Sequence, residues 1–330
     1  MAGIVWKVAH CLAFVQLDEG IEVLENGVFS SCRSLRQVTI PSSVKSLGGW
    51  MFFSCTNLRL VSFRGSVREI QERTFSGCYE LEQVLIPAGL EKIGVEAFYE
   101  CTNLKHVVLP STVKEIQRQA FTNDRYFEEL VLPKSLERLE ESVFHGCFGI
   151  KKLTIPGFLK EIPMKTFYGC KGLKELIIQE GVQKIGDQAL GRCMELKSVE
   201  LPQSITELGE GVFESCSHLK KIVLPMGLRR IGSNCFARCV ELTEITFPDS
   251  LEEIGGNAFG ACTGWQTQRD LLFRSLRGMP ILAKKRNLRC LRILTGFPVV
   301  RLQKIQNITR FIFRRMSLPL EREHFGDVSI

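Results

Sequence analysis

Cysteine is the residue in this chain with the widest chemical range, because thiols form disulfides, bind metals and act as nucleophiles. There are 13 cysteines, and ten of them are separated by 23 residues or a multiple of 23: Cys32, Cys55, Cys78, Cys101, Cys147, Cys170, Cys193, Cys216, Cys239 and Cys262. A zinc site would need paired Cys-x-x-Cys motifs or nearby histidines, and no Cys-x-x-Cys occurs. We therefore predict buried thiols that pack as small hydrophobes, which suits a reducing compartment.

The histidines offer no better candidate for chemistry. The five of them occupy different places relative to the 23-residue spacing, at His10, His106, His145, His218 and His324. The phosphate-loop, dinucleotide, His-Glu-x-x-His and Gly-x-Ser-x-Gly motifs are all missing from the sequence. Catalysis needs dissimilar residues that converge on one point. We predict no catalytic residues, no metal, no cofactor and no small-molecule substrate.

The cysteines belong to a longer unit that must position every other side chain. One copy spans residues 75–97 and reads FSGCYELEQVLIPAGLEKIGVEA. Its first residue recurs without insertion or deletion at Trp6, Phe29, Phe52, Phe75, Phe98, Phe121, Phe144, Phe167, Leu190, Phe213, Phe236 and Phe259. A fixed period of about 20–29 residues is typical of a solenoid of leucine-rich repeats.

The first half of each unit predicts a strand, and the second half predicts a return path. Val84 and Ile86 alternate with outward residues, and Pro87 ends the strand because proline lacks an amide N–H. Eleven such strands, centred from Val15 to Ile245, can pair only as a parallel ladder about 50 Å long. The return path suits an irregular or 3₁₀-like coil. Gly94 recurs in it, and we expect it to serve close packing rather than a left-handed backbone.

The repeated pattern LxxVxIPxxLxxIGxxAFxxC closely resembles the BspA-like, or Treponema-type, leucine-rich repeats. The resemblance covers residues 6–264, about four-fifths of the chain. It implies an arc-shaped or nearly straight solenoid, and a family whose members are often surface proteins that bind other proteins. We therefore predict an α/β-type repeat solenoid dominated by short parallel β-strands. It would have about eleven 23-residue coils and one parallel sheet on one face.

The outward strand positions are the candidate protein-binding face. One column of them is rich in apolar and β-branched residues, and a line of lysines lies where the strands begin. The candidate residues are Lys105, Val108, Val131, Lys151, Lys152, Thr154, Lys174, Ile177, Lys197, Lys220 and Val223. An apolar strip marks an interface, but strand propensity alone would give the same composition. The cations either steer an acidic partner or form a solvated rim.

One unit, residues 121–143, departs from the pattern. It has Asp124 in place of the cysteine and Phe127 in place of the leucine. Two interpretations compete, namely a polar notch in the middle of the array and ordinary drift with Asp124 at the coil surface. We favour drift.

The repeat breaks down after Cys262, which divides the chain into a solenoid, residues 1–264, and a basic extension, residues 265–330. Residues 1–262 hold 29 Lys+Arg and 32 Asp+Glu, whereas residues 263–330 hold 14 and 4. Residues 282–300 return to the 23-residue register, either because they form a degenerate cap of the solenoid or by coincidence. We expect the rest of the extension to be irregular or disordered. An altered reading frame in the gene model is a third explanation for the loss of the repeat. Basic residues among Leu, Ile and Phe also fit contact with a membrane or partner, or with nucleic acid.

These features predict a non-enzymatic scaffold that presents its sheet face to a protein partner, and the line of lysines would suit an acidic partner. One alternative is a BspA-type adhesin at the cell surface, and another is an array whose basic tail binds membrane or nucleic acid. The first 17 residues already occupy core positions of a coil, so we do not expect them to be a cleaved signal peptide. We therefore favour a cytoplasmic location, with the cell surface as the alternative.

Overall fold

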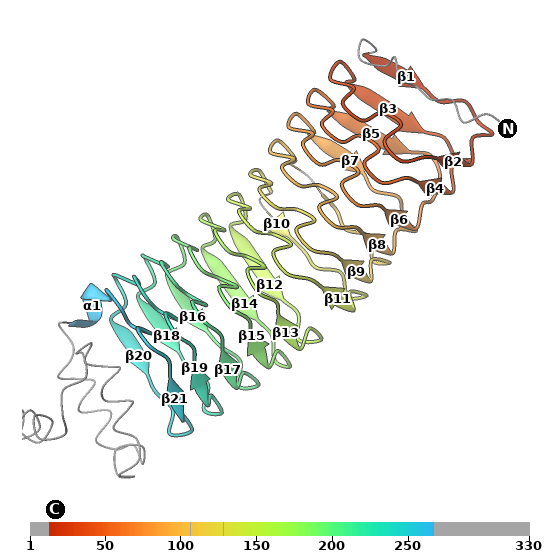
Figure 1. Ribbon diagram of the computed structural model, residues 1–330. Helices are drawn as coiled ribbons and strands as arrows, with labels where there is room; N and C mark the ends of the chain where they lie inside the picture. The colour runs from red at the N-terminus through yellow and green to blue at the C-terminus, as the bar shows by residue number, and fades with distance from the viewer. Residues whose placement is uncertain (1–12, 106, 128, 267–330) are drawn as a thin grey trace, which may run out of the picture.

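The computed structural model describes residues 13–105, 107–127 and 129–266. The chain winds into stacked coils, and two rows of strands run the length of the elongated molecule (Figure 1). One row, the long ladder, consists of β1 (Phe14–Gln16), β3 (Gln37–Ile40), β5 (Leu60–Phe63), β7 (Gln83–Leu85), β10 (Glu129–Leu130), β12 (Lys152–Ile155), β14 (Glu175–Ile178), β16 (Ser198–Glu200), β18 (Lys221–Val223) and β20 (Glu244–Thr246).

The other row, the short ladder, lies on the return path and is built from two-residue strands. Its members are β2 (Val23–Leu24), β4 (Ser46–Leu47), β6 (Glu69–Ile70), β8 (Lys92–Ile93), β9 (Glu115–Ile116), β11 (Arg138–Leu139), β13 (Glu161–Ile162), β15 (Lys184–Ile185), β17 (Glu207–Leu208), β19 (Arg230–Ile231) and β21 (Glu253–Ile254). The single helix among the described residues is α1 (Thr263–Gln266). The return path is thus more regular than predicted.

Pairing is parallel in both ladders, and partners are 23 residues apart, as in Thr154 opposite Ile177. The long ladder is divided into three sheets, β1-β3-β5-β7, β10-β12-β14 and β16-β18-β20. The short ladder is divided into β2-β4, β6-β8-β9-β11 and β13-β15-β17-β19-β21. The structure is therefore a parallel β-solenoid. The α/β label and the single sheet on one face do not describe it, because the return path contributes strands and almost no helix.

The long ladder is interrupted in the coil of residues 98–120. We predicted a strand centred on Val107, but residues 107–110 form none. The next coil contributes only the two residues of β10. Ten strands of the expected eleven are therefore present in the described part of this ladder.

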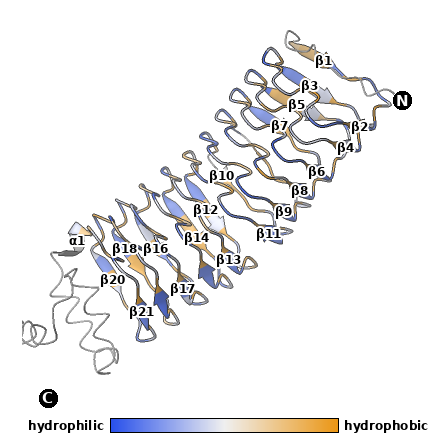
Figure 2. Cartoon of the chain, in the orientation of Figure 1, coloured by the Kyte–Doolittle hydropathy of each residue, from blue (hydrophilic) through white to orange (hydrophobic). Residues whose placement is uncertain are grey.

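A column of phenylalanine rings fills the interior. Phe75, Phe98 and Phe144 are fully buried, and consecutive rings stack with centroids 5.0–5.5 Å apart. Leu190 takes the place of one ring and is equally buried. The phenylalanines that recur every 23 residues therefore lie over one another in a single elongated core. Offset aromatic pairs at such distances add to the burial of apolar area. Figure 2 shows the surrounding coils alternating between hydrophobic and hydrophilic segments.

Close packing of neighbouring coils explains the recurring glycine. A Cβ on Gly94 would lie 2.8 Å from the carbonyl carbon of Gln71 and from the amide nitrogen of Glu72. Its φ is not among the positive values, so the expectation of compactness is confirmed. Left-handed residues lie elsewhere, two positions before and after the core phenylalanine, as at Arg73 (φ 50°) and Gly77 (φ 75°). Most are not glycine, so no residue type marks these positions in advance.

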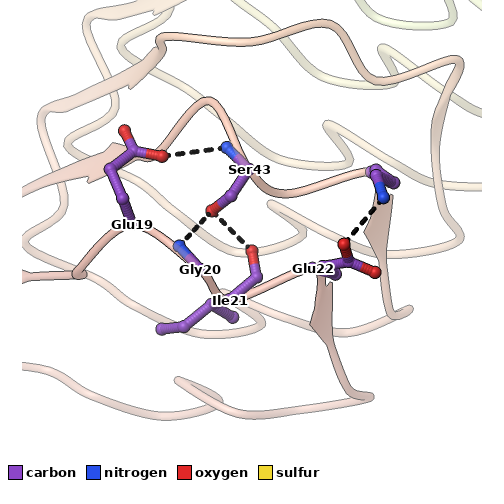
Figure 3. Close-up of polar contacts among 6 residues, drawn as sticks. Glu19, Gly20, Ile21, Glu22 and Ser43 are labelled. Atoms are coloured by element: carbon purple, nitrogen blue, oxygen red, sulfur yellow. Dashed lines mark hydrogen bonds and ion pairs between the residues drawn. The ribbon is translucent and has the colours of Figure 1, made fainter.

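Side chains also hold the turns that follow the long ladder. The Glu19 carboxylate accepts hydrogen bonds from the backbone amides of Ser42 (3.2 Å) and Ser43 (3.0 Å). The Ser43 hydroxyl donates to the Ile21 carbonyl and accepts from the Gly20 amide (Figure 3). The same arrangement recurs at Glu180, Gly181, Val182, Gln203 and Ser204. Asp18 and Gln179 replace the strand-ending proline at these two turns, so a Glu-Gly pair compensates for its loss.

Candidate functional site

The outer face of the long ladder carries the candidate apolar residues. We call Leu85, Val108, Val131, Thr154, Ile177 and Val223 the apolar column. In β12, Leu153 and Ile155 are buried, so Lys152 and Thr154 must point outward. Val108 is 82% exposed and Val131 is 72% exposed. Leu85, Ile177 and Val223 are 49%, 48% and 38% exposed, whereas Thr154 is half-buried. The column is broken by Glu200, which pairs in register with Val223.

Cations line the start of the same strands. We call Lys105, Lys151, Lys174, Lys197 and Lys220 the lysine column, and all five are exposed. Lys105 lies 3.8 Å from Glu82, and Lys220 lies 3.6 Å from Glu241. Lys152, in the adjacent column, pairs with Glu175 at 3.3 Å. Exposed pairs of this kind contribute about 0–1 kcal/mol each.

Two members of the lysine column differ from the rest. Lys174 and Lys197 form no ion pair within the part of the chain that the structure describes. They lie in adjacent coils and are both exposed. These two ammonium groups are therefore available to carboxylates of another molecule.

An open hollow lies at the interruption of the long ladder. Its volume is about 360 Å³, and side chains of β7 and of the following coil line it, chiefly Gln83, Leu85, Ala88, Val108 and Pro110. Among the lining residues that the structure describes, Gln83 is the one with a polar side chain. Nothing in the repeat pattern predicted this feature, because residues 107–110 match the strand consensus and still form no strand.

The cysteine column is structural. All eleven cysteines in the described residues are free and buried, as predicted. Nine of them donate a hydrogen bond from Sγ to the carbonyl of the core residue 26 positions earlier, at 2.8–3.5 Å. Burial raises the pKa of the Cys170 and Cys216 thiols to about 12. These groups are protonated donors at neutral pH and not nucleophiles.

Asp124 occupies the place of a cysteine in this column. We expected it at the coil surface, and that expectation was wrong, because its side chain is fully buried. Neither carboxyl oxygen has a hydrogen-bond partner among the described residues. Burial raises the pKa of the Asp124 carboxyl well above its usual range, and the nearby Cys101 backbone offsets only part of this. The neighbouring thiols of Cys101 and Cys147 have raised pKa values for the same main reason.

The other titratable groups do not converge on a reaction centre. His145 is partly buried, and its ring lies 5.3 Å from that of Tyr168. Burial, and then the charges of Lys165 and Arg192, lower its pKa. Across the residues described here, no three His, Cys, Asp or Glu side chains are placed to hold a metal ion together. His10, His106 and His324 lie outside the described residues, as do residues 267–330 with the predicted cap.

Comparisons with known proteins agree with this architecture. A family model described as a BspA-type leucine-rich repeat region matches residues 22–151 and 137–266. A leucine-rich repeat protein from Bacteroides ovatus is 30% identical, with a TM-score of 0.66 over 76% of this chain and 73% of that one. No curated protein matches the chain.

Two more distant structures share the fold. A leucine-rich repeat protein from Eubacterium ventriosum is 21% identical, with a TM-score of 0.53 over 78% of this chain and 85% of that one. The pneumococcal vaccine antigen PcpA is 22% identical, with a TM-score of 0.55 over 78% of both chains. In the described residues, α1 is far too short to cross a bilayer, and no other helix is present to do so.

Proposed function

Because this chain belongs to the BspA-type leucine-rich repeat family, we propose that it is a non-enzymatic scaffold that binds another protein across the outer face of its long ladder. The solenoid supplies a long, rigid surface on which equivalent residues of successive coils lie side by side. Such a surface suits recognition of an extended partner, and it offers no enclosed site for a reaction.

The apolar column is the observation that carries this proposal. Isolated exposed apolar residues are ordinary, but contiguous ones on a soluble surface tend to be covered by a partner. Val108 and Val131 are in adjacent coils, and both are more than two-thirds exposed. Strand propensity does not explain Val108, because it lies in no strand.

The lysine column supports an acidic partner. Lys174 and Lys197 have no carboxylate to neutralise them among the described residues. A line of unpaired cations attracts negative charge and raises the rate of association. The candidate residues Lys151, Lys152 and Lys220 lie along the same edge, where Lys152 pairs with Glu175 and Lys220 with Glu241.

Site-specific photocrosslinking tests the proposal. A photoreactive amino acid at Val131 should crosslink to a protein in extracts of cells that make this chain, whereas the same group at Lys184, on the short ladder, should not. The captured protein would then be purified and titrated against wild type and Ile177→Glu, which should bind at least about tenfold more weakly. Equal crosslinking from both faces, or no loss of affinity in the variant, would count against the long ladder as the binding face.

A surface adhesin is the second candidate, because the BspA-type repeats matched here occur in a family whose members are often surface proteins that bind other proteins. Labelling intact producing cells with a membrane-impermeant biotin reagent separates the two, because only a surface protein would be modified before lysis. The alternative in which the basic tail binds membrane or nucleic acid concerns residues 265–330. Deletion of this segment should leave crosslinking from Val131 unchanged if the long ladder is the binding face.

A further inference from the structure

We propose that the hollow at the interruption of the long ladder receives one large apolar side chain of the partner, while carboxylates of the same partner segment contact Lys174 and Lys197. This inference rests on the proposed function and adds to it a point of anchoring and the chemistry of the bound segment. The occupant is an extended acidic stretch of polypeptide with a single apolar anchor.

The hollow exists because two neighbouring strands are lost or shortened. β7 is the last strand of its sheet, residues 107–110 form no strand, and β10 has only two residues. The same region carries the departures from the repeat, since Phe127 replaces a leucine and tilts against Phe121 and Phe144 with centroids 5.9 and 6.2 Å away. The surface is therefore least regular where the apolar column is most exposed.

The lining favours an apolar side chain over a metabolite. Sites for small molecules combine an apolar wall with a few polar groups that fix orientation. Here Leu85, Ala88, Val108 and Pro110 form most of the wall, and none of the described lining residues carries a charge. At about 360 Å³, the hollow has room for one leucine, methionine or phenylalanine side chain.

The spacing of the coils sets the position of the partner's carboxylates. Val108 lies in the coil of residues 98–120, and Lys174 and Lys197 lie three and four coils further along. Coils stack at about 4.8 Å, so the lysines are roughly 14–19 Å from the hollow along the axis. An extended chain covers that distance in about four to six residues. The bound segment should therefore have acidic residues about four and about six positions from its apolar anchor, which is the same face of an extended chain as the anchor.

Fluorescein-labelled synthetic peptides provide the test. The first peptide carries one leucine and, about four and six residues further on, two glutamates in an otherwise Gly/Ser background. The second replaces the leucine with serine, and the third replaces the glutamates with lysines. Fluorescence anisotropy would be measured with wild type, Val108→Ser/Val131→Ser, Lys174→Glu/Lys197→Glu, and a short-ladder control, Lys45→Glu/Lys184→Glu. Circular dichroism and thermal unfolding would establish that each variant is folded.

We expect the first peptide to bind wild type and the short-ladder control alike, and to bind each long-ladder variant at least about tenfold more weakly. The lysine peptide should prefer Lys174→Glu/Lys197→Glu, because the charges on both sides are then exchanged. If the affinity is the same without the leucine of the peptide, or without Val108 and Val131 of the protein, the proposed apolar anchor is wrong. If the lysine peptide does not prefer Lys174→Glu/Lys197→Glu, the proposed contact with the two lysines is wrong. Failure of all peptides at about 1 mM, with specific crosslinking from Val131 intact, would reject this inference and leave the proposed function standing.

Discussion

Replacement of Asp124 by cysteine should stabilise the protein. Nine cysteines of its column donate a thiol hydrogen bond to a core carbonyl at 2.8–3.5 Å, whereas neither oxygen of Asp124 has a partner among the described residues. A buried polar group left without a hydrogen bond costs about 1–3 kcal/mol. Asp124→Cys should recover a free energy of unfolding of about that size near pH 4, where the carboxyl of the unfolded chain is about half protonated.

The gain should increase with pH, and the sign follows from the pKa. Burial raises the pKa of Asp124 in the folded protein, so the folded state binds the proton more tightly than the unfolded state. The stability linked to this group is fully present below its unfolded pKa and is lost as the pH rises through the folded pKa. Relative to Asp124→Cys, wild type should lose about 1.4 kcal/mol per pH unit over this range, the slope for one proton.

Urea unfolding followed by circular dichroism, at pH 4, 5.5, 7 and 8.5, would measure both effects. Asp124→Asn should abolish the pH dependence without restoring the thiol hydrogen bond, and thus separates charge from hydrogen bonding. Asp249→Asn is the matched control, because Asp249 is exposed and its change should stay within about 0.5 kcal/mol. Parallel pH profiles for wild type and Asp124→Cys would refute the assignment of a raised pKa to a buried Asp124.

Three further predictions concern packing, thiol reactivity and a turn. Gly94→Ala should lower the free energy of unfolding by about 1–3 kcal/mol, because the new Cβ would lie 2.8 Å from backbone atoms of the preceding coil. Gly256→Ala is the control, because no atom lies within 4 Å of its Cβ, and the same urea assay should show that it is tolerated. Cys170 should resist a maleimide at pH 8 until the protein unfolds, since burial raises its pKa to about 12; peptide mapping of native and urea-treated protein would detect this. The hydrogen bond from the Ser42 amide is the main reason why the pKa of Glu19 is lowered in the folded protein. The stability that the Glu19 carboxylate contributes is therefore present above its unfolded pKa, and it is lost as the pH falls through the folded pKa. Glu19→Gln should therefore speed hydrogen exchange at that amide near neutral pH, and the difference from wild type should vanish in acid.

The constant length of the coils explains which parts of the fold the sequence predicts. A 23-residue period places Thr154 beside Ile177 and stacks Phe75 on Phe98, because a crossover of fixed length cannot shift the register. The short ladder could not be predicted in the same way. Its strands, such as β8, have two residues, too few to show an alternation of period two. The left-handed positions on either side of the core ring could not be predicted either, because Arg73 and other long polar residues occupy these positions in place of glycine.

Asp124 shows which of two sequence signals determines burial in such a fold. Its register places it between Cys101 and Cys147, both fully buried, while its charge suggests the surface. The structure follows the register, because the chain on both sides is held by Phe121 and Phe127 in the core, and a carboxyl between them has no path to solvent. On the candidate binding face, register likewise outweighs residue type, but here it places an apolar side chain in solvent. Val108 is apolar, but its outward register leaves it 82% exposed. Position within the period therefore decides which side chains a solenoid buries, and residue type decides what that burial or exposure costs.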